Sequence, residues 1–145
     1  MKKKPPIEKI YEAYSAIADN RVRLEDNRAA VTSSDGKKTY TVTWQGDCYS
    51  SDDSATYWQG YPGYPVIAVL MLQGKLPVNI EAAKLFSGIN WNELNRSFKR
   101  DYAKAVEEVF KQVTRNEAER ETIIREVAHI FELLMHLDIS IKRGR

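Results

Sequence analysis

The period of the hydrophobic positions changes twice along the chain and divides it into three parts. Over residues 7–18, apolar side chains recur three and four positions apart, which predicts an amphipathic helix. Over residues 21–50, apolar and polar side chains alternate, which predicts strands with one buried face. Residues that favour turns separate these strands at 25–27, 33–36 and 45–47. We therefore expect three or four antiparallel strands joined as a meander.

Beyond the strands, the pattern is helical. Pro65 suits the first position of a helix and Gly74 suits a left-handed C-terminal cap, so a short helix is predicted over 65–73. Nearly every direction around this helix is apolar. Because a helix on the surface needs a polar side, we expect the 65–73 helix to be the buried centre of the fold.

Three further helices are predicted downstream of the 65–73 helix. Asn90 and Glu93 form a capping box before one of them, and Thr114 and Glu117 form another. The predicted helices cover 79–86, 92–113 and 123–137.

Together, these elements predict an α+β fold. An N-terminal helix packs on a three- to four-stranded antiparallel meander, and a mostly helical C-terminal half follows around the 65–73 helix. A chain of 145 residues is long enough for one core, so we expect a single domain over 1–145. The basic ends, 1–4 and 142–145, are expected to be flexible.

Composition narrows the class of protein. With 22 basic and 20 acidic residues, the formal charge is only +2, so any basic surface must be local. Cys48 is the only cysteine, and no apolar leader begins the chain, so a cytoplasmic protein is expected. The longest apolar run, 66–72, is far shorter than the roughly 20 residues of a membrane span. We therefore expect a soluble protein with no membrane association.

The two histidines are the first candidates for metal chemistry. Glu126 and His129 have the Glu-x-x-His spacing of carboxylate-bridged di-iron bundles, but Leu133 stands where a second such pair with His136 would need its glutamate. Both histidines are expected on the polar side of the last helix. No nucleophile elbow or phosphate-binding glycine loop is present, so we predict no metal site, no catalytic residue and no cofactor.

The last predicted helix, 123–137, has an unusually wide apolar arc. The arc covers about 200°, whereas a helix on the surface of a monomer requires about 100°. Either this helix is covered on both flanks within the chain, which we favour, or part of it contacts a second copy in a homo-oligomer.

A cluster of basic residues lies on one side of the predicted 92–113 helix, away from its apolar stripe. This side could contact phosphates, although an ordinary solvated face is the more common meaning of such a pattern. The candidate nucleic-acid-binding residues are Arg96, Lys99, Arg100 and Lys104.

The strongest candidate for a ligand site is the aromatic loop 49–64. A loop this aromatic must pack some of its rings, so it either seats the helix that follows or forms the rim of a cleft at that helix's N-terminus. The first alternative is favoured. The candidate ligand-binding residues are Tyr57, Trp58, Tyr61, Tyr64 and Asp53.

These observations support three hypotheses for the function. The first is a small non-catalytic binding or interaction protein that uses the aromatic loop 49–64, with the last helix as a second candidate surface. The alternative is a nucleic-acid-binding protein that uses the basic residues of the 92–113 helix and the basic tails. The third is an enzyme whose site is assembled in the loop, which the missing motifs disfavour.

Overall fold

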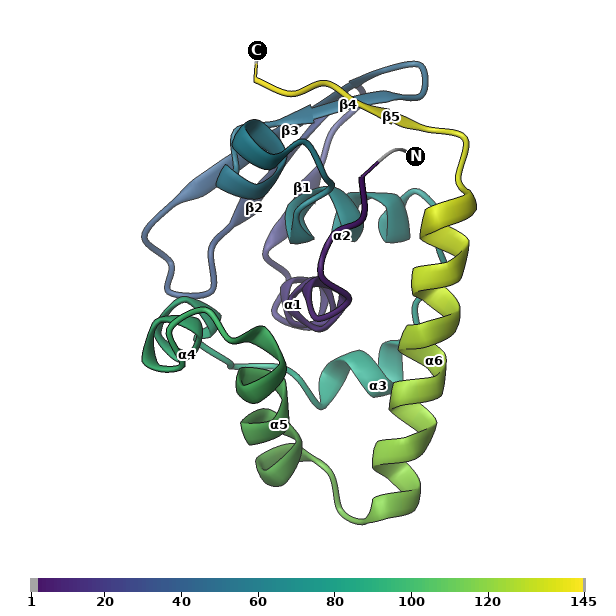
Figure 1. Cartoon of the computed structure of the whole chain (residues 1–145). Helices are drawn as coiled ribbons and strands as arrows, with labels where there is room; N and C mark the ends of the chain where they lie inside the picture. The colour runs from purple at the N-terminus through teal and green to yellow at the C-terminus, as the bar shows by residue number, and fades with distance from the viewer. Residues whose placement is uncertain (1–2, 145) are drawn as a thin grey trace.

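The computed structural model describes residues 3–144, and its strands form one mixed sheet in the order β1-β2-β3-β4-β5 (Figure 1). The strands are β1 (Val22–Leu24), β2 (Arg28–Thr32), β3 (Thr39–Gln45), β4 (Cys48–Ser51) and β5 (Ser140–Ile141). The first four strands pair antiparallel in sequence order, which confirms the predicted meander. The fifth pairs parallel with β4 and was not predicted.

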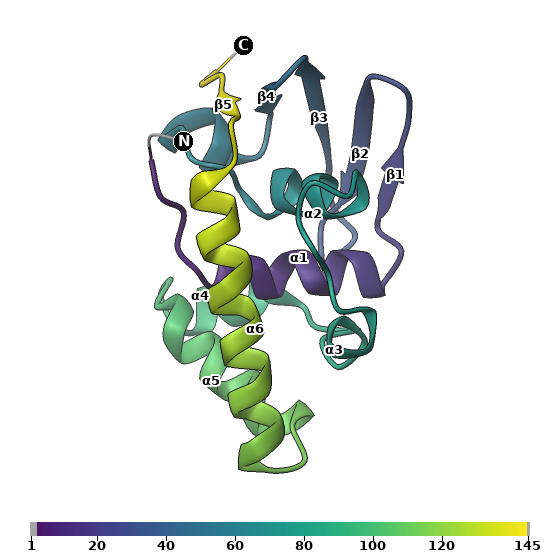
Figure 2. The ribbon, with the colours of Figure 1, turned by 90° about the vertical axis from the view of Figure 1, so that its right-hand side faces the viewer.

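The remaining regular elements of the described chain are helices. They are α1 (Lys9–Ala18), the π-helix η1 (Ala55–Gln59), α2 (Tyr64–Leu72), α3 (Ile80–Lys84), α4 (Trp91–Ser97), α5 (Tyr102–Val113) and α6 (Glu117–His136). The helices α1 and α2 lie on one side of the sheet, and α6 runs along the flank of the molecule (Figure 2). The predicted α+β class is confirmed.

Helix α2 is the centre of this arrangement, as predicted. It contacts β1, β3 and β4 on one side and α1 on the other. All residues from Pro65 to Met71 are buried, because neighbours cover every direction around the helix. Gly74 ends the helix with a φ of 77°, a backbone conformation that glycine adopts without strain.

The indole of Trp91 ties the C-terminal half to the first helix. Its Nε1 donates a hydrogen bond to Ser15 Oγ at 2.8 Å, and Ser15 Oγ donates in turn to the Phe86 carbonyl. On the opposite side, the backbone N–H of Trp91 donates to Ser34 Oγ in the β2–β3 hairpin at 2.9 Å. Helix α4 is therefore fixed to both α1 and the hairpin, which lies beside it in Figure 1.

The prediction of one continuous helix over 92–113 is wrong. The structure has two helices, α4 and α5, separated at residues 98–101. The N–H groups of Lys99 and Arg100 donate to the carbonyls of Arg96 and Asn95, the pattern of a Schellman C-cap. Because this cap normally carries glycine, two basic residues gave no sign of it in the sequence. Asp101 then begins α5 by accepting a hydrogen bond from the Lys104 N–H.

Two boundaries also differ from the predictions. The capping box of Thr114 with Glu117 is wrong, since Asn116 caps α6 by accepting a hydrogen bond from the Glu119 N–H. Thr114 instead ends α5, where its hydroxyl donates to the Phe110 carbonyl. The aromatic segment 49–64 is not one loop, because it contains the end of β4, all of η1 and the start of α2.

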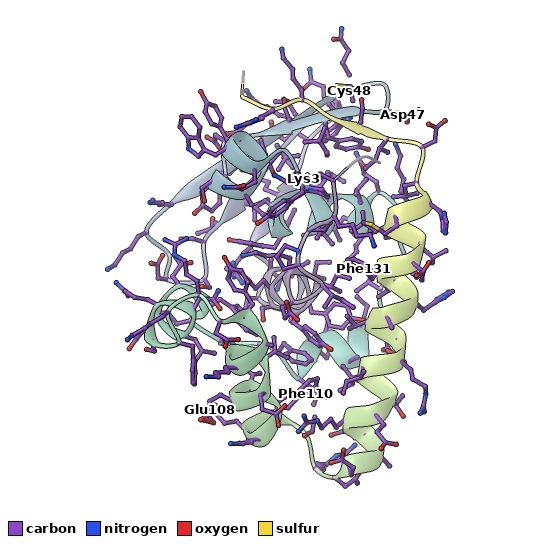
Figure 3. All side chains as sticks on the ribbon, in the orientation of Figure 1. Lys3, Asp47, Cys48, Glu108, Phe110 and Phe131 are labelled. Atoms are coloured by element: carbon purple, nitrogen blue, oxygen red, sulfur yellow. The ribbon has the colours of Figure 1, made fainter. Side chains whose placement is uncertain are left out.

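Side chains of α5 and α6 fill the interior between these helices and α1. Phe110 is buried and contacts the ring of Tyr11 edge-on, while Glu108 points away from the interior (Figure 3). On α6, the buried residues are Ile123, Val127, Ile130 and Leu134. Leu133 and Ile124 keep 36% and 41% of their surface exposed, so the chain itself covers only part of the wide apolar arc.

Candidate functional site

A cleft of about 1020 Å³ opens between α1, the β2–β3 hairpin, η1 and the α4–α5 junction. Aromatic side chains from η1 and the segment after it form one wall, and basic side chains from the α4–α5 junction form another. The hydrogen bond between Ser34 and Trp91 holds the hairpin and α4 together at this place. Four segments that are distant in sequence therefore share one concave surface.

The aromatic wall is held by a short hydrogen-bond network before α2. Asp53 Oδ2 accepts hydrogen bonds from the N–H and the hydroxyl of Thr56, both at 3.1 Å. The Thr56 hydroxyl accepts one from the Gly63 N–H at 3.0 Å. A Cβ on Gly63 would lie 2.1 Å from Asp53 Oδ2, so only glycine fits this close approach. The network joins the start of η1 to the start of α2.

Trp58 lies on η1 with 61% of its surface exposed, the largest exposed fraction of any large hydrophobic side chain in the described structure. Its ring packs edge-on against Tyr57, with 4.7 Å between the ring centroids. Both ends of the described chain hold η1 in place. Lys3 Nζ donates to the Gln59 carbonyl at 2.6 Å, and the Gly144 N–H donates to the Tyr57 carbonyl at 3.1 Å.

Basic side chains outnumber acidic ones around the cleft, six to three. Lys9 pairs with Glu12 at 3.3 Å. The other five cations form no ion pair with any residue that the structure describes, and all five are exposed. They are Lys37, Lys38, Arg96, Lys99 and Arg100. The cleft therefore carries uncompensated positive charge.

The three carboxylates around the cleft are all engaged within the protein. Asp35 accepts hydrogen bonds from Ser33 Oγ and the Lys37 N–H, and the bond from Ser33 contributes most to holding its pKa well below the usual range. Burial raises the pKa of Glu12, although Lys9 and Asn95 oppose the shift. Asp53 is occupied on one oxygen by Thr56. The three carboxylates therefore offset only part of the positive charge of the six cations, of which the five exposed, unpaired ones are called the rim cations.

Phenol groups in the cleft add polarity without adding charge. Burial raises the pKa of Tyr40, Tyr61 and Tyr64 above the ordinary value, so all three stay neutral at physiological pH. Their hydroxyls can donate and accept hydrogen bonds there.

One comparison with known proteins decides the family. A family model described as "Uncharacterised conserved protein UCP014422" matches residues 2–140. The chain belongs to this family. No curated protein and no solved structure matches it. The description of the family names no activity.

The structure brings the two sets of predicted site residues together, although the sequence presented them as alternatives. Of the ligand-binding set, all but Tyr57 line the cleft, and Tyr57 packs behind Trp58. Of the basic set, all but Lys104 line it. Lys104 lies on α5, where its ammonium is 3.8 Å from the Asp101 carboxylate.

The residues of the basic tails that the structure describes do not line this cleft. Lys142 pairs with β4 through a hydrogen bond from its N–H to the Tyr49 carbonyl at 2.7 Å. The side chain of Arg143 lies against Gly60 at the end of η1. Of the N-terminal tail, Lys3 contacts Gln59 and lies 5.7 Å from the ring centroid of Tyr61, whereas residues 1, 2 and 145 lie outside the described part of the chain.

Sequence reasoning missed several cleft residues. Lys37 and Lys38 follow the predicted turn at 33–36, and Asn92 and Asn95 lie on α4. Two adjacent lysines after a turn are usually ordinary solvent-exposed residues. These two line the cleft because the hairpin contacts α4. No local signal in the sequence gives that contact.

Lys99 and Arg100 have strained backbones at the edge of the cleft. Their φ values are 54° and 66°, and this left-handed region costs residues with a side chain roughly 1–2 kcal/mol each relative to the right-handed helix. Such strain is concentrated at functional sites in proteins. A glycine would relieve it at either position but would remove a cation from the cleft.

Neither metal binding nor a membrane span finds support in the described residues. Both histidines are exposed on α6, and His136 lies 3.6 Å from Glu132. No group of three or more potential metal ligands occurs in the described part of the chain. Over residues 3–144, no helix is both long and apolar enough to cross a membrane.

Proposed function

We propose that this protein is a non-catalytic binding protein that holds single-stranded nucleic acid in the cleft. The observation that carries the proposal is the meeting of five unpaired cations and the exposed Trp58 on one concave surface. Proteins that bind single strands combine these two features, a positively charged groove for the phosphates and aromatic rings on which the bases stack.

The exposed aromatic ring favours a single strand over a duplex. A base can stack on Trp58 only when it is free of its neighbours, which a duplex prevents. The phosphates on either side of that base would then face the cations of the hairpin and of the α4–α5 junction. The volume of the cleft, about 1020 Å³, is at the upper end of the range for small-molecule sites and leaves room for more than one nucleotide.

Replacing Trp58 with alanine tests the stacking role. Because the ring is mostly exposed, we expect the melting temperature of Trp58→Ala to change by no more than about 2 °C. The affinity for a labelled oligo(dU) of about 12 nucleotides should fall roughly 5- to 100-fold, the effect of losing one stacked base. Fluorescence anisotropy at low salt measures this affinity.

Trp58→Phe is the matched variant, since it keeps an aromatic face and should recover part of the lost affinity. Binding by Trp58→Ala that equals that of the unaltered protein would count against the stacking role. A large drop in its melting temperature would indicate that the ring seats α2 instead.

A further inference from the structure

Two hydrogen-bond acceptors on residues that line the cleft have no partner. Asp53 is 5% exposed, and its Oδ1 is buried and unbonded, as is Oδ1 of the half-buried Asn95. Leaving such an oxygen unpaired away from water costs roughly 1–3 kcal/mol, so each one favours a donor from outside the chain, either a water molecule or a ligand. Both atoms are acceptors, and this restricts what the donor can be.

The assignment is firmest at Asp53, because a carboxylate oxygen accepts hydrogen bonds and, unlike an amide, the group has no NH₂ that could take its place. Its Oδ2 is already used by the N–H and the hydroxyl of Thr56, which leaves Oδ1 for a ligand. At Asn95, the bond from Nδ2 to Glu12 Oε2 at 3.4 Å fixes the amide with its oxygen as the free group.

We propose that Asp53 Oδ1 accepts a hydrogen bond from the exocyclic amino group of a base, so that the cleft prefers amino-bearing bases to uracil. This inference rests on the proposed binding of single strands. Guanine carries its amino group at C2, whereas cytosine and adenine carry theirs where uracil presents the carbonyl oxygen O4. That oxygen would face the Asp53 carboxylate and be repelled by it.

Neighbouring side chains must move aside for the base to reach this carboxylate, because Oδ1 is shielded from solvent. The rim cations position the backbone of the strand, and Asp53 reads the edge of the base. The rim cations and the free oxygens of Asp53 and Asn95 thus select a ligand that carries both a negative charge and a hydrogen-bond donor.

The test compares oligo(dC) with oligo(dU), whose rings have the same size. The bases differ in the exocyclic group at C4 and at N3, which is an acceptor in cytosine and an N–H donor in uracil. At mildly alkaline pH, where cytosine is unprotonated, we expect oligo(dC) to bind roughly tenfold more tightly. Equal affinity for the two would overturn the inference and leave the proposed function standing. Binding of neither oligonucleotide would overturn the proposed function itself.

Asp53→Asn gives the sharper result. The asparagine oxygen must remain with the two donors of Thr56, so its NH₂ group takes the place of the free Oδ1 and turns an acceptor into a donor. We expect the variant to lose the preference for oligo(dC) or to reverse it, while its melting temperature stays close to that of the unaltered protein. An unchanged preference in this variant would show that Asp53 does not read the base.

Discussion

Reversing the charge of Lys99 and Arg100 together should lower the affinity for single-stranded oligonucleotides roughly 100-fold at low salt. Both cations line the cleft, neither forms an ion pair with a described residue, and both are exposed. Lys99→Glu/Arg100→Glu removes two phosphate contacts and adds repulsion at the same place. Anisotropy titrations at a fixed, low salt concentration measure the change.

The matched control is Lys111→Glu/Arg125→Glu, which changes the net charge by the same amount. Both residues are exposed and lie on α5 and α6, outside the lining of the cleft. We expect the control to lose only a few-fold in affinity, through the overall field of the protein. Equal losses in the two double variants would mean that binding follows net charge and has no particular place on the surface.

Gly63→Ala should produce the largest loss of stability among the changes at the cleft. The new Cβ would lie 2.1 Å from Asp53 Oδ2 and 3.2 Å from the Cβ of Ala55, so the carboxylate must move and give up its bonds to Thr56. Overpacking together with the lost hydrogen bonds costs about 2–4 kcal/mol. Thermal unfolding should show a melting temperature lower by roughly 6–12 °C.

A double-mutant cycle identifies the cause of that loss. Asp53→Ala on its own should destabilise the protein by removing the bonds to Thr56, but it also removes the atoms that Gly63→Ala would strike. The double variant should therefore be more stable than the sum of the single effects implies. Strict additivity would show that the alanine at 63 acts through something other than the carboxylate.

The buried centre of this fold could be predicted from sequence because the signal is local. An apolar run bounded by Pro65 and Gly74 has no polar side to give to solvent, and the structure buries every residue from Pro65 to Met71. The alternation along β1 to β4 is local in the same way. The two residues of β5 are too few to show a pattern, and their pairing with β4 depends on where α6 ends.

The break between α4 and α5 could not be predicted, because its conformation contradicts local preference. Lys99 and Arg100 favour a continuing helix, yet they occupy the left-handed positions of a helix cap. The strain there places two cations on the cleft that a continuous helix would have carried elsewhere. A departure from local preference of this kind is expected where function sets the geometry.

The sequence predicted the aromatic and the basic residues of the candidate site, but not that they share one cleft. The aromatic set around Trp58 and the basic set around Lys99 each stood out in the sequence, but as competing hypotheses. They share a cleft because Ser34 accepts the N–H of Trp91 and because η1 is held by Asp53 and Gly63. These contacts join residues that are distant along the chain. The spacing of apolar and polar positions in the sequence carries no information about them.

The most direct test of the central claim is the salt dependence of oligo(dU) binding by the unaltered protein. If the five rim cations contact phosphates, the logarithm of the binding constant should fall linearly with the logarithm of salt concentration, with a slope between about −2 and −3.5. Absence of binding at low salt, or an affinity that salt does not change, would contradict the proposal that this cleft binds single-stranded nucleic acid.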